Sequence, residues 1–242
     1  MDVNSHVAIS GQLAQAKRLE TIANNVANAG TAGFRAEGVS FSTIVSKTAP
    51  FDTSFAFEGG SHADTRSGAF TATGNPLDVA VQGSGFLAVL TPEGTAYTRD
   101  GRMQMLPTGD IVSLSGHPIL DASASPLSAN PRGGALDIGR DGVIRQDGRV
   151  VGSLGLFEID LTRGYRRYEN AAFLPAGPVE PVQEFSTNGV LQGFVEGSNV
   201  NPILEMTRLI EVQRAFEAVS ASLEQRDSAI RDTIQALGAR GS

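Results

Sequence analysis

The sequence predicts an α+β fold: a discontinuous helical domain built from both ends of the chain, with a mainly antiparallel β domain inserted between them. Three observations predict it. Apolar residues recur every three or four positions at both ends, turn residues divide the middle into short apolar runs, and glycine makes up 28 of the 242 residues. The first pattern is typical of amphipathic helices, and the other two are typical of short strands joined by turns. We expect the N- and C-terminal helices to pair in a coiled-coil-like manner.

Residues 3–29 are predicted to form the first helix. Its apolar positions are mostly three or four residues apart, at Val3, Val7, Ile9, Leu13, Ala16, Leu19, Ile22, Val26 and Ala29. Gly30 and Gly33 supply stop signals, because glycine tolerates the left-handed conformation at a helix end.

Three asparagines, Asn24, Asn25 and Asn28, occupy polar positions of this helix. Asparagine is a poor helix former, because its amide competes for backbone hydrogen bonds. They are either polar residues near a fraying end, which suits Asn28, or amides that face other helices of an assembly. We favour the second interpretation for Asn24 and Asn25, because a neutral amide is satisfied across an interface where a buried Glu or Lys would need a charge partner.

The central part of the chain is predicted to be β structure. Residues 36–66 lack a sustained period and are expected to form an irregular or extended connector with room for one hairpin. From there to residue 197, turn signals such as Asp100-Gly101, Asp147-Gly148 and Asn188-Gly189 separate short apolar runs. The predicted strands are LDVAV (77–81), FLAVL (86–90), RMQML (102–106), GVIRQ (142–146) and VVGSLGLFEI (150–159). The domains are therefore predicted at 1–35 and 198–242 (helical), 36–66 (connector) and 67–197 (β).

Residues 202–237 are predicted to form a long second helix. Asn201 and Pro202 are suited to its N-cap and first turn, and Gly238 to its end. Steps of three and four residues connect Met206, Leu209, Gln213, Phe216, Ser220, Leu223, Asp227, Ile230, Ile234 and Leu237. Charges that alternate in sign every third residue are expected to form a solvated face, at Glu205, Arg208, Glu211, Arg214 and Glu217.

The length of this helix indicates partners. As one helix it would be about 54 Å long, whereas a compact globule of this size has a diameter near ~46 Å. The apolar stripe therefore needs the N-terminal helix, other subunits, or both to cover it.

Bulk properties exclude several classes of protein. The net charge of −7 and the pI near 5.0 argue against a nucleic-acid partner. The chain has no cysteine, which excludes disulfides and thiolate sites. No apolar run approaches the ~18 residues of a membrane-spanning helix, and the first residues do not resemble a cleavable signal peptide. By these signals alone the chain would be expected in the cytoplasm.

The sequence contains no motif that indicates a catalytic, cofactor or metal site. Gly83-Ser84-Gly85-Phe86-Leu87-Ala88 fits a variant of the dinucleotide fingerprint, but a strand rather than a helix follows it, so a tight turn is the better interpretation. His6, His62 and His117 have no carboxylate or histidine at metal-ligand spacing, and His117 is expected to be a lone loop residue.

Three blocks of sequence resemble one protein family. IANNVANAGTAGFRAEG (22–38) resembles the N-terminal signature of bacterial flagellar basal-body rod and hook proteins, N-N-[ILV]-A-N-x-x-T-x-G-[FY]. EGSNVNPILEMTRLIEVQRAFEA (196–218) resembles their C-terminal signature, and residues 75–120 resemble the central domain of the FlgF and FlgG type rod subunits and the related hook subunit. The chain is thus identified as a member of the flagellar basal-body rod protein family, closest to the FlgF-type proximal rod subunit.

The resemblance implies a structural role. Such proteins assemble helically into the rod, the periplasmic drive shaft of the flagellum, and are exported by its type III apparatus without a cleaved signal peptide. The implied partners are other rod subunits, copies of the same chain and, during secretion, the export apparatus. The residues predicted to contact neighbouring subunits are Ile22, Asn24, Asn25, Val26, Asn28, Gly33, Phe34, Asn199, Asn201, Met206, Leu209, Gln213, Phe216, Leu223, Ile230 and Ile234.

Three alternatives stay open at this point. The chain could be a FlgG-type distal rod subunit, since the match weakens between residues 121 and 185. It could be an enzyme acting on the cell wall that the rod crosses, which would need a carboxylate pair or a metal site in the β domain. It could also be a soluble adaptor or chaperone.

Overall fold

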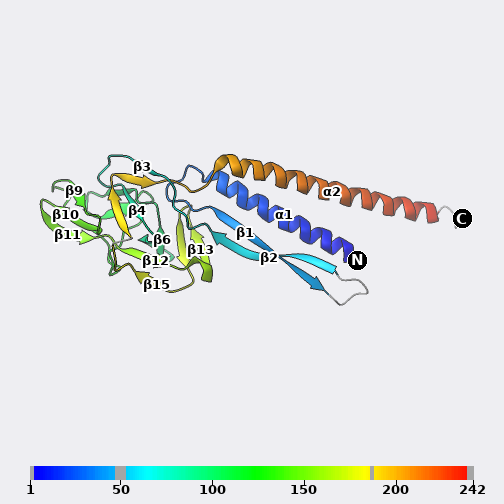
Figure 1. The fold of residues 1–242 in the computed structure, drawn as a ribbon, viewed down its shortest axis with the longest axis horizontal. Helices are drawn as coiled ribbons and strands as arrows, with labels where there is room; N and C mark the ends of the chain where they lie inside the picture. Colours follow the sequence, from blue (N-terminus) through cyan, green and yellow to red (C-terminus); the bar gives the residue numbers. More distant parts are fainter. Residues whose placement is uncertain (1–2, 47–52, 186–187, 239–242) are drawn as a thin grey trace. The chain divides into compact units, whose positions relative to one another are not determined.

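The computed structural model describes residues 3–46, 53–185 and 188–238 (Figure 1). The chain divides into two compact units. The helical unit comprises residues 1–26, 37–61 and 201–242, and the β unit comprises residues 27–36 and 62–200. Each unit therefore contains segments that are far apart in the sequence. The α+β class and the mainly antiparallel strands predicted from the sequence are confirmed.

The helical unit contains two long helices and a two-stranded sheet. Helix α1 is Val3–Ala27 and helix α2 is Pro202–Gly238. The sheet pairs β1, Glu37–Ser46, with β2, Thr53–Ala63. Helix α1 ends two residues before the predicted boundary, and Asn201 caps α2 as predicted, because its Oδ1 accepts a hydrogen bond from the Leu204 amide at 3.2 Å.

Short strands make up the β unit, together with the 3₁₀ helix η1, Leu161–Arg163. The strands are β3 Phe70–Ala72, β4 Val79–Gln82, β5 Phe86–Thr91, β6 Gly94–Thr98, β7 Met103–Met105, β8 Ile111–Ser113, β9 Leu136–Ile138, β10 Val143–Gln146, β11 Arg149–Ser153, β12 Leu156–Ile159, β13 Tyr165–Tyr168, β14 Ala172–Pro175, β15 Val179–Pro181, β16 Gly189–Gln192 and β17 Phe194–Glu196.

The largest sheet of the β unit has six strands in the order β13-β14-β6-β5-β12-β15. A three-stranded sheet has the order β11-β10-β9, and β16-β4, β17-β3 and β7-β8 form two-stranded sheets. Neighbouring strands in these sheets run antiparallel. The pairs β16-β4 and β17-β3 bring the last strands of the unit beside its first ones.

Strand β5 lies at the centre of the hydrophobic core. Leu87 and Val89 belong to the main buried cluster, whereas Phe86 and Ala88 belong to two smaller clusters. Successive side chains of a strand point to opposite faces, so β5 is covered on both sides. This double burial explains why its sequence is a continuous apolar run.

Turn residues fall where the sequence predicts them. Asp147 and Gly148 both have positive φ, 52° and 75°, as the tight turn between β10 and β11 requires. The motif at 83–85 connects β4 to β5, so a strand follows it as predicted. One strand prediction is wrong, because the run 150–159 is divided into β11 and β12. Between these strands, Gly155 lies close to the backbone of Asp121, where an added Cβ would be 2.5 Å from the carbonyl oxygen.

Candidate functional site

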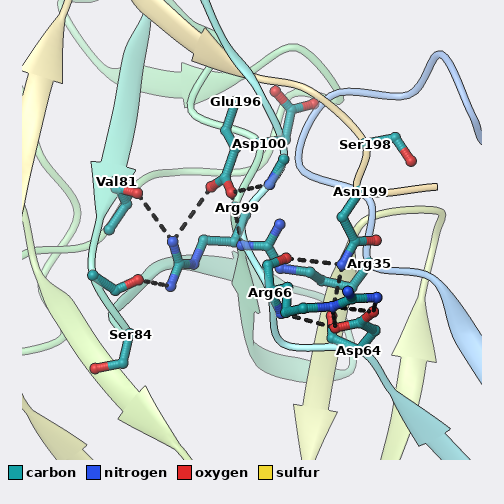
Figure 2. A network of polar contacts seen from close by, with 12 residues as sticks. Arg35, Asp64, Arg66, Val81, Ser84, Arg99, Asp100, Glu196, Ser198 and Asn199 are labelled. Atoms are coloured by element: carbon teal, nitrogen blue, oxygen red, sulfur yellow. Dashed lines mark hydrogen bonds and ion pairs between the residues drawn. The ribbon is translucent and has the colours of Figure 1, made fainter. Parts of the chain in front are cut away.

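The β unit encloses a cluster of three buried charged side chains (Figure 2). Arg35 and Glu196 are fully buried, and the side chain of Arg99 is 1% exposed. Arg35 Nη2 lies 2.8 Å from Glu196 Oε1, and Arg99 Nη1 lies 3.3 Å from Glu196 Oε2. One carboxylate therefore bridges two guanidinium groups from distant parts of the chain.

Backbone contacts bring the first segment of this cluster into place. The Gly33 amide donates a hydrogen bond to the Glu196 carbonyl oxygen at 2.8 Å. Gly33 has a φ of +67°, and an added Cβ would lie 2.2 Å from the Asp100 amide nitrogen. Only glycine fits both the conformation and the space. The turn at Gly33 thus directs the chain so that Arg35 reaches Glu196.

Arg99 has further partners inside the β unit. Its Nη1 donates to the Val81 carbonyl oxygen at 3.0 Å, and its Nη2 donates to the Gly83 carbonyl oxygen at 2.6 Å. Its guanidinium carbon also lies 4.7 Å from the centre of the Phe86 ring, within cation–π range. Arg99 consequently fixes the turn between β4 and β5 as well as Glu196.

The cluster carries more positive than negative charge. Two guanidinium groups face one carboxylate, and Arg35 Nε, Arg35 Nη1 and Arg99 Nε have no hydrogen-bond partner within the described residues. Burial, and then the neighbouring charge of Arg35, lower the pKa of Arg99 to about 10. Because removal of one partner of a buried ion pair is costly, Glu196 is the residue on which the cluster depends.

Asn199 forms a second junction next to the cluster (Figure 2). Its Nδ2 donates to the carbonyl oxygens of Asp64 at 2.9 Å and Arg66 at 2.8 Å, and its Oδ1 accepts from the Ala36 amide at 2.7 Å. All three bonds use main-chain groups of the partners. The amide thus joins the segment after Gly33 to the start of the β unit's second segment.

In the helical unit, Asn25 joins distant parts of the chain through its side-chain amide, as Asn199 does in the β unit. Its Oδ1 accepts from the Glu37 amide at 2.9 Å, and its Nδ2 donates to the Glu37 carbonyl oxygen at 2.8 Å and to Glu205 Oε2 at 3.4 Å. Asn25 thereby finds hydrogen-bond partners within its own chain. Both a donor and an acceptor are used, which explains an amide at this helix position.

The prediction that Glu205 belongs to a solvated face is wrong. The residue is only 5% exposed, although its neighbours Leu204 and Met206 are exposed. Arg208 Nη1 donates to Glu205 Oε1 at 2.5 Å, and Asn25 contacts the other carboxylate oxygen. The alternating charges do pair at three-residue spacing here, but hydrogen bonds from Asn25 and Arg208 let the Glu205 carboxylate be buried, whereas the Arg208 side chain is 54% exposed.

Comparison with known proteins finds matches over most of the chain. Three family models match: Flagella basal body rod protein at residues 6–35, Flagellar hook protein FlgE/F/G D1 domain at 80–151, and Flagellar basal body rod FlgEFG protein C-terminal at 191–236. The chain is 47% identical to the flagellar basal-body rod protein FlgF of Mesorhizobium japonicum, over 99% of this chain and all of that protein. It is 41% identical to FlgF of Rhizobium meliloti, over 98% of this chain and 99% of that protein.

The chain belongs to the FlgF family of flagellar basal-body rod proteins. This confirms the resemblance seen in the sequence. FlgG proteins are more distant relatives: the chain is 30% identical to FlgG of Caulobacter vibrioides, over 94% of this chain and 97% of that protein. The comparison therefore favours the FlgF type over the FlgG type, and it makes the chain a structural component of the flagellar rod.

Each of the three family segments contributes one residue to the buried cluster. Arg35 closes the N-terminal segment 6–35, Arg99 lies in the segment 80–151, and Glu196 lies in the C-terminal segment 191–236. Sequence reasoning missed all three residues as a site. One signal in the sequence could have pointed to two of them, because Arg35 and Glu196 both lie within the segments that resemble the rod-protein signatures.

The residues predicted to contact other subunits are placed in three different environments. Buried ones are Ile22, Asn25, Asn28, Gly33 and Phe34; half-buried ones are Asn24, Val26, Asn199 and Leu209; exposed ones are Asn201, Met206, Gln213 and Phe216. Leu223, Ile230 and Ile234 lie on α2, but their side chains are outside the described part of the chain. Contact of these residues with a neighbouring subunit stays a prediction.

His117 lies in the loop after β8, as predicted, and it has a carboxylate partner 52 positions away that sequence spacing does not reveal. Its Nε2 lies 3.1 Å from Glu169 Oε1, and Ser115 Oγ donates to Glu169 Oε2 at 2.8 Å. These groups line a pocket of about 160 Å³. The serine is bonded to the carboxylate and not to the imidazole, so the arrangement lacks the nucleophile–base contact of acyl-transfer enzymes.

The described residues contain neither a metal-binding cluster nor a membrane-spanning helix. No three His, Cys, Asp or Glu side chains gather there into a group that could hold a metal ion. Neither described helix has a stretch of the length and apolarity needed to cross a bilayer.

Proposed function

We propose that this FlgF-family chain is a non-catalytic subunit of the proximal rod that assembles helically with copies of itself and with other rod subunits. The observation that carries this proposal is the set of large apolar side chains that are exposed on α1 and α2. Leu13 is 67% exposed and Ile203 is 78% exposed. Other large apolar side chains exposed on these helices are Ile9, Leu204, Met206, Ile210 and Phe216. Such surface is typical of protein–protein interfaces.

The two helices are proposed to form an antiparallel, coiled-coil-like pair. Gln12 Nε2 donates to Ser220 Oγ at 3.4 Å, and Asn25 contacts Glu205. The residue numbers increase along α1 while they decrease along α2, which supports the antiparallel direction. Burial of Ile22 and Val212 supports an apolar seam between these polar contacts.

Assembly is proposed to follow from contacts that do not close into a ring. Heterologous contacts of this kind generate an open helical tube. In it, the helical segments 1–35 and 198–242 would surround the export channel, and the β domain at 67–197 would form an outer layer that stiffens the shaft against torque. The connector at 36–66 would link the two. Residence in the periplasm, and export by the type III apparatus without a cleaved signal peptide, belong to the same proposal.

Hydrogen exchange on the verified monomer and on assembled basal bodies tests this function. We expect weak protection of residues 5–28 and 205–237 in the monomer, because their exposed apolar side chains lack partners, and strong protection after assembly. Strong protection of both segments in the monomer would contradict the part of the proposal in which these helices become ordered on assembly. The substitution Met206→Ser should abolish assembly, whereas Leu114→Ser, at a similarly exposed leucine of the β unit, should not.

A further inference from the structure

Four arginines of the β unit lack the partners that its other arginines have. Arg35, Arg66, Arg99, Arg102, Arg163, Arg166 and Arg167 each make an ion pair or a side-chain hydrogen bond. Within the described residues, the structure gives no such contact to the side chains of Arg132, Arg140, Arg145 and Arg149. All four lie in the segment that forms β9, β10 and the start of β11. These four arginines therefore stand in one part of the β unit, in a segment that also contains Asp137, Asp141 and Asp147.

Two exposed valines accompany these arginines on the edge strand β11. Val150 is 64% exposed, and Val151 is also exposed. Arg145 pairs with Val150 and Ile144 pairs with Gly152, so Val151 is the extra residue of a β-bulge. Directly paired residues of an antiparallel sheet share a face, which places Arg145 beside Val150. Asp137 is the direct partner of Arg145 on its other side, so Arg145 lies between this carboxylate and Val150 in the row.

A groove lined by carboxylates lies along β15, an edge strand of the six-stranded sheet. It has a volume of about 500 Å³ and is lined by Glu158, Glu180, Pro181, Val182, Gln183, Glu184 and Asn188. Glu158 and Glu180 are directly paired across β12 and β15, although like charges opposite each other destabilise a sheet. Within the described residues, no cation pairs with any of the three glutamates. The groove thus combines two apolar residues, Pro181 and Val182, with a pair of carboxylates that has no cationic partner. Glu158 Oε1 accepts hydrogen bonds from Ser84 Oγ at 2.9 Å and from Asn188 Nδ2 at 3.3 Å.

We propose that the Val150–Val151 knob of one copy of this chain inserts into the Glu158–Glu180–Glu184 groove of the next copy. Arg145 then lies against the Glu158–Glu180 pair, and the valines pack against Val182 and Pro181. The occupant is a second copy because this chain itself carries both the unpaired cations and the unpaired carboxylates. Opposite potentials on the two surfaces also set the orientation of the contact.

The two surfaces lie at different places on the β unit. Figure 1 shows β11 at the end of the unit and β15 along its lower margin. A contact between them joins unlike surfaces, so each added copy leaves one free knob and one free groove. The inference rests on the proposed helical assembly and adds a specific contact between neighbouring β domains.

Disulfide cross-linking in basal bodies tests this contact, because the chain has no cysteine of its own. Cells co-express full-length Val150→Cys and Gln183→Cys chains, and isolated basal bodies are oxidised and run on a non-reducing gel. A disulfide forms only where the two Cα atoms lie within about 7 Å of each other. The proposed contact brings Val150 of one copy next to Gln183 of the next copy, so we expect a cross-linked dimer. The control pair is Leu114→Cys with Gln183→Cys, in which the first position is similarly exposed; it should give at least tenfold less dimer.

A charge exchange excludes misfolding as the reason for a lost cross-link. Arg145→Glu added to the Val150→Cys chain should remove most of the dimer, and Glu180→Arg added to the Gln183→Cys chain should restore it. Chains that are present in basal bodies but give no dimer would overturn the knob-and-groove contact alone. Absence of the chain from basal bodies would overturn the proposed function, and this inference with it.

Discussion

Glu196 Oε1 lies 2.8 Å from Arg35 Nη2, although 161 positions separate the two residues in the chain. Both side chains are fully buried. One residue belongs to the N-terminal rod-protein segment and the other to the C-terminal one. The ion pair therefore closes the β unit by joining the segment that follows α1 in the chain to the segment that precedes α2.

Replacement of Glu196 by Gln should strongly destabilise the β unit. It removes the only carboxylate of the cluster and leaves Arg35 and Arg99 buried without a counter-charge, which costs about 3–5 kcal/mol. Urea unfolding followed by near-UV circular dichroism measures the loss. The matched control is Glu93→Gln, which breaks an exposed pair with Arg166 and should cost less than about 1 kcal/mol. Equal losses for both variants would contradict the role assigned to Glu196.

Gly33→Ala should destabilise the protein more than Gly74→Ala does. Both glycines have a φ near +70°, but only at Gly33 would the added Cβ meet the backbone of Arg99 and Asp100. Gly74→Ala thus measures only the free-energy cost of placing alanine in a left-handed conformation, about 1–2 kcal/mol. The difference between the two variants measures the additional cost of the clash between the new Cβ and the backbone of Arg99 and Asp100. Thermal unfolding of both variants gives this difference, and similar melting temperatures would show that the close approach does not constrain the site.

The helices and many strands could be predicted from the sequence because their signals are local. Apolar residues at three- and four-residue spacing mark α1 and α2, and turns such as Asp147-Gly148 end strands wherever they occur. The Arg35–Arg99–Glu196 cluster could not be predicted in this way. Its members come from segments whose encounter depends on the whole topology, and a charged residue in isolation is most simply read as exposed.

For Glu205, too, local sequence spacing predicts only part of the environment that the structure shows. The alternation of charge along α2 correctly predicts its pair with Arg208, but not its burial. Burial depends on Asn25, which lies 180 positions away and supplies the second hydrogen bond. Asn25 has a poor propensity for a helix interior, and its hydrogen bonds with the Glu37 backbone give a physical reason for an asparagine there.

Asn25→Asp should destabilise the isolated chain as well as impair motility. The new carboxylate would lose the amide donor and face the Glu37 carbonyl oxygen and the Glu205 carboxylate, a cost of about 1–3 kcal/mol. Adding Glu205→Gln should recover part of this stability, because the second substitution supplies the missing donor. Chemical unfolding of the single and double variants tests the exchange; no recovery would mean that the two side chains do not interact.

The carboxyl group of Asp64 should titrate below its usual range. Hydrogen bonds from the Arg66 side chain, opposed by burial and supported by the Arg66 amide, lower its pKa. A carboxyl whose pKa is lower in the folded state contributes stability above its ordinary pKa and loses that contribution as pH falls through the folded value. Carboxyl carbon NMR should show the Asp64 pKa rising in Arg66→Ala, while Arg132→Ala should leave it unchanged.

Electron microscopy of isolated basal bodies that carry a labelled copy of this chain tests the central claim most directly. The account predicts label on the rod itself, in its base-proximal part, repeated around the axis as expected for a helically assembled subunit. Rods that are complete but carry no label, or label found only outside the rod, would contradict the assignment of this chain as a structural rod subunit.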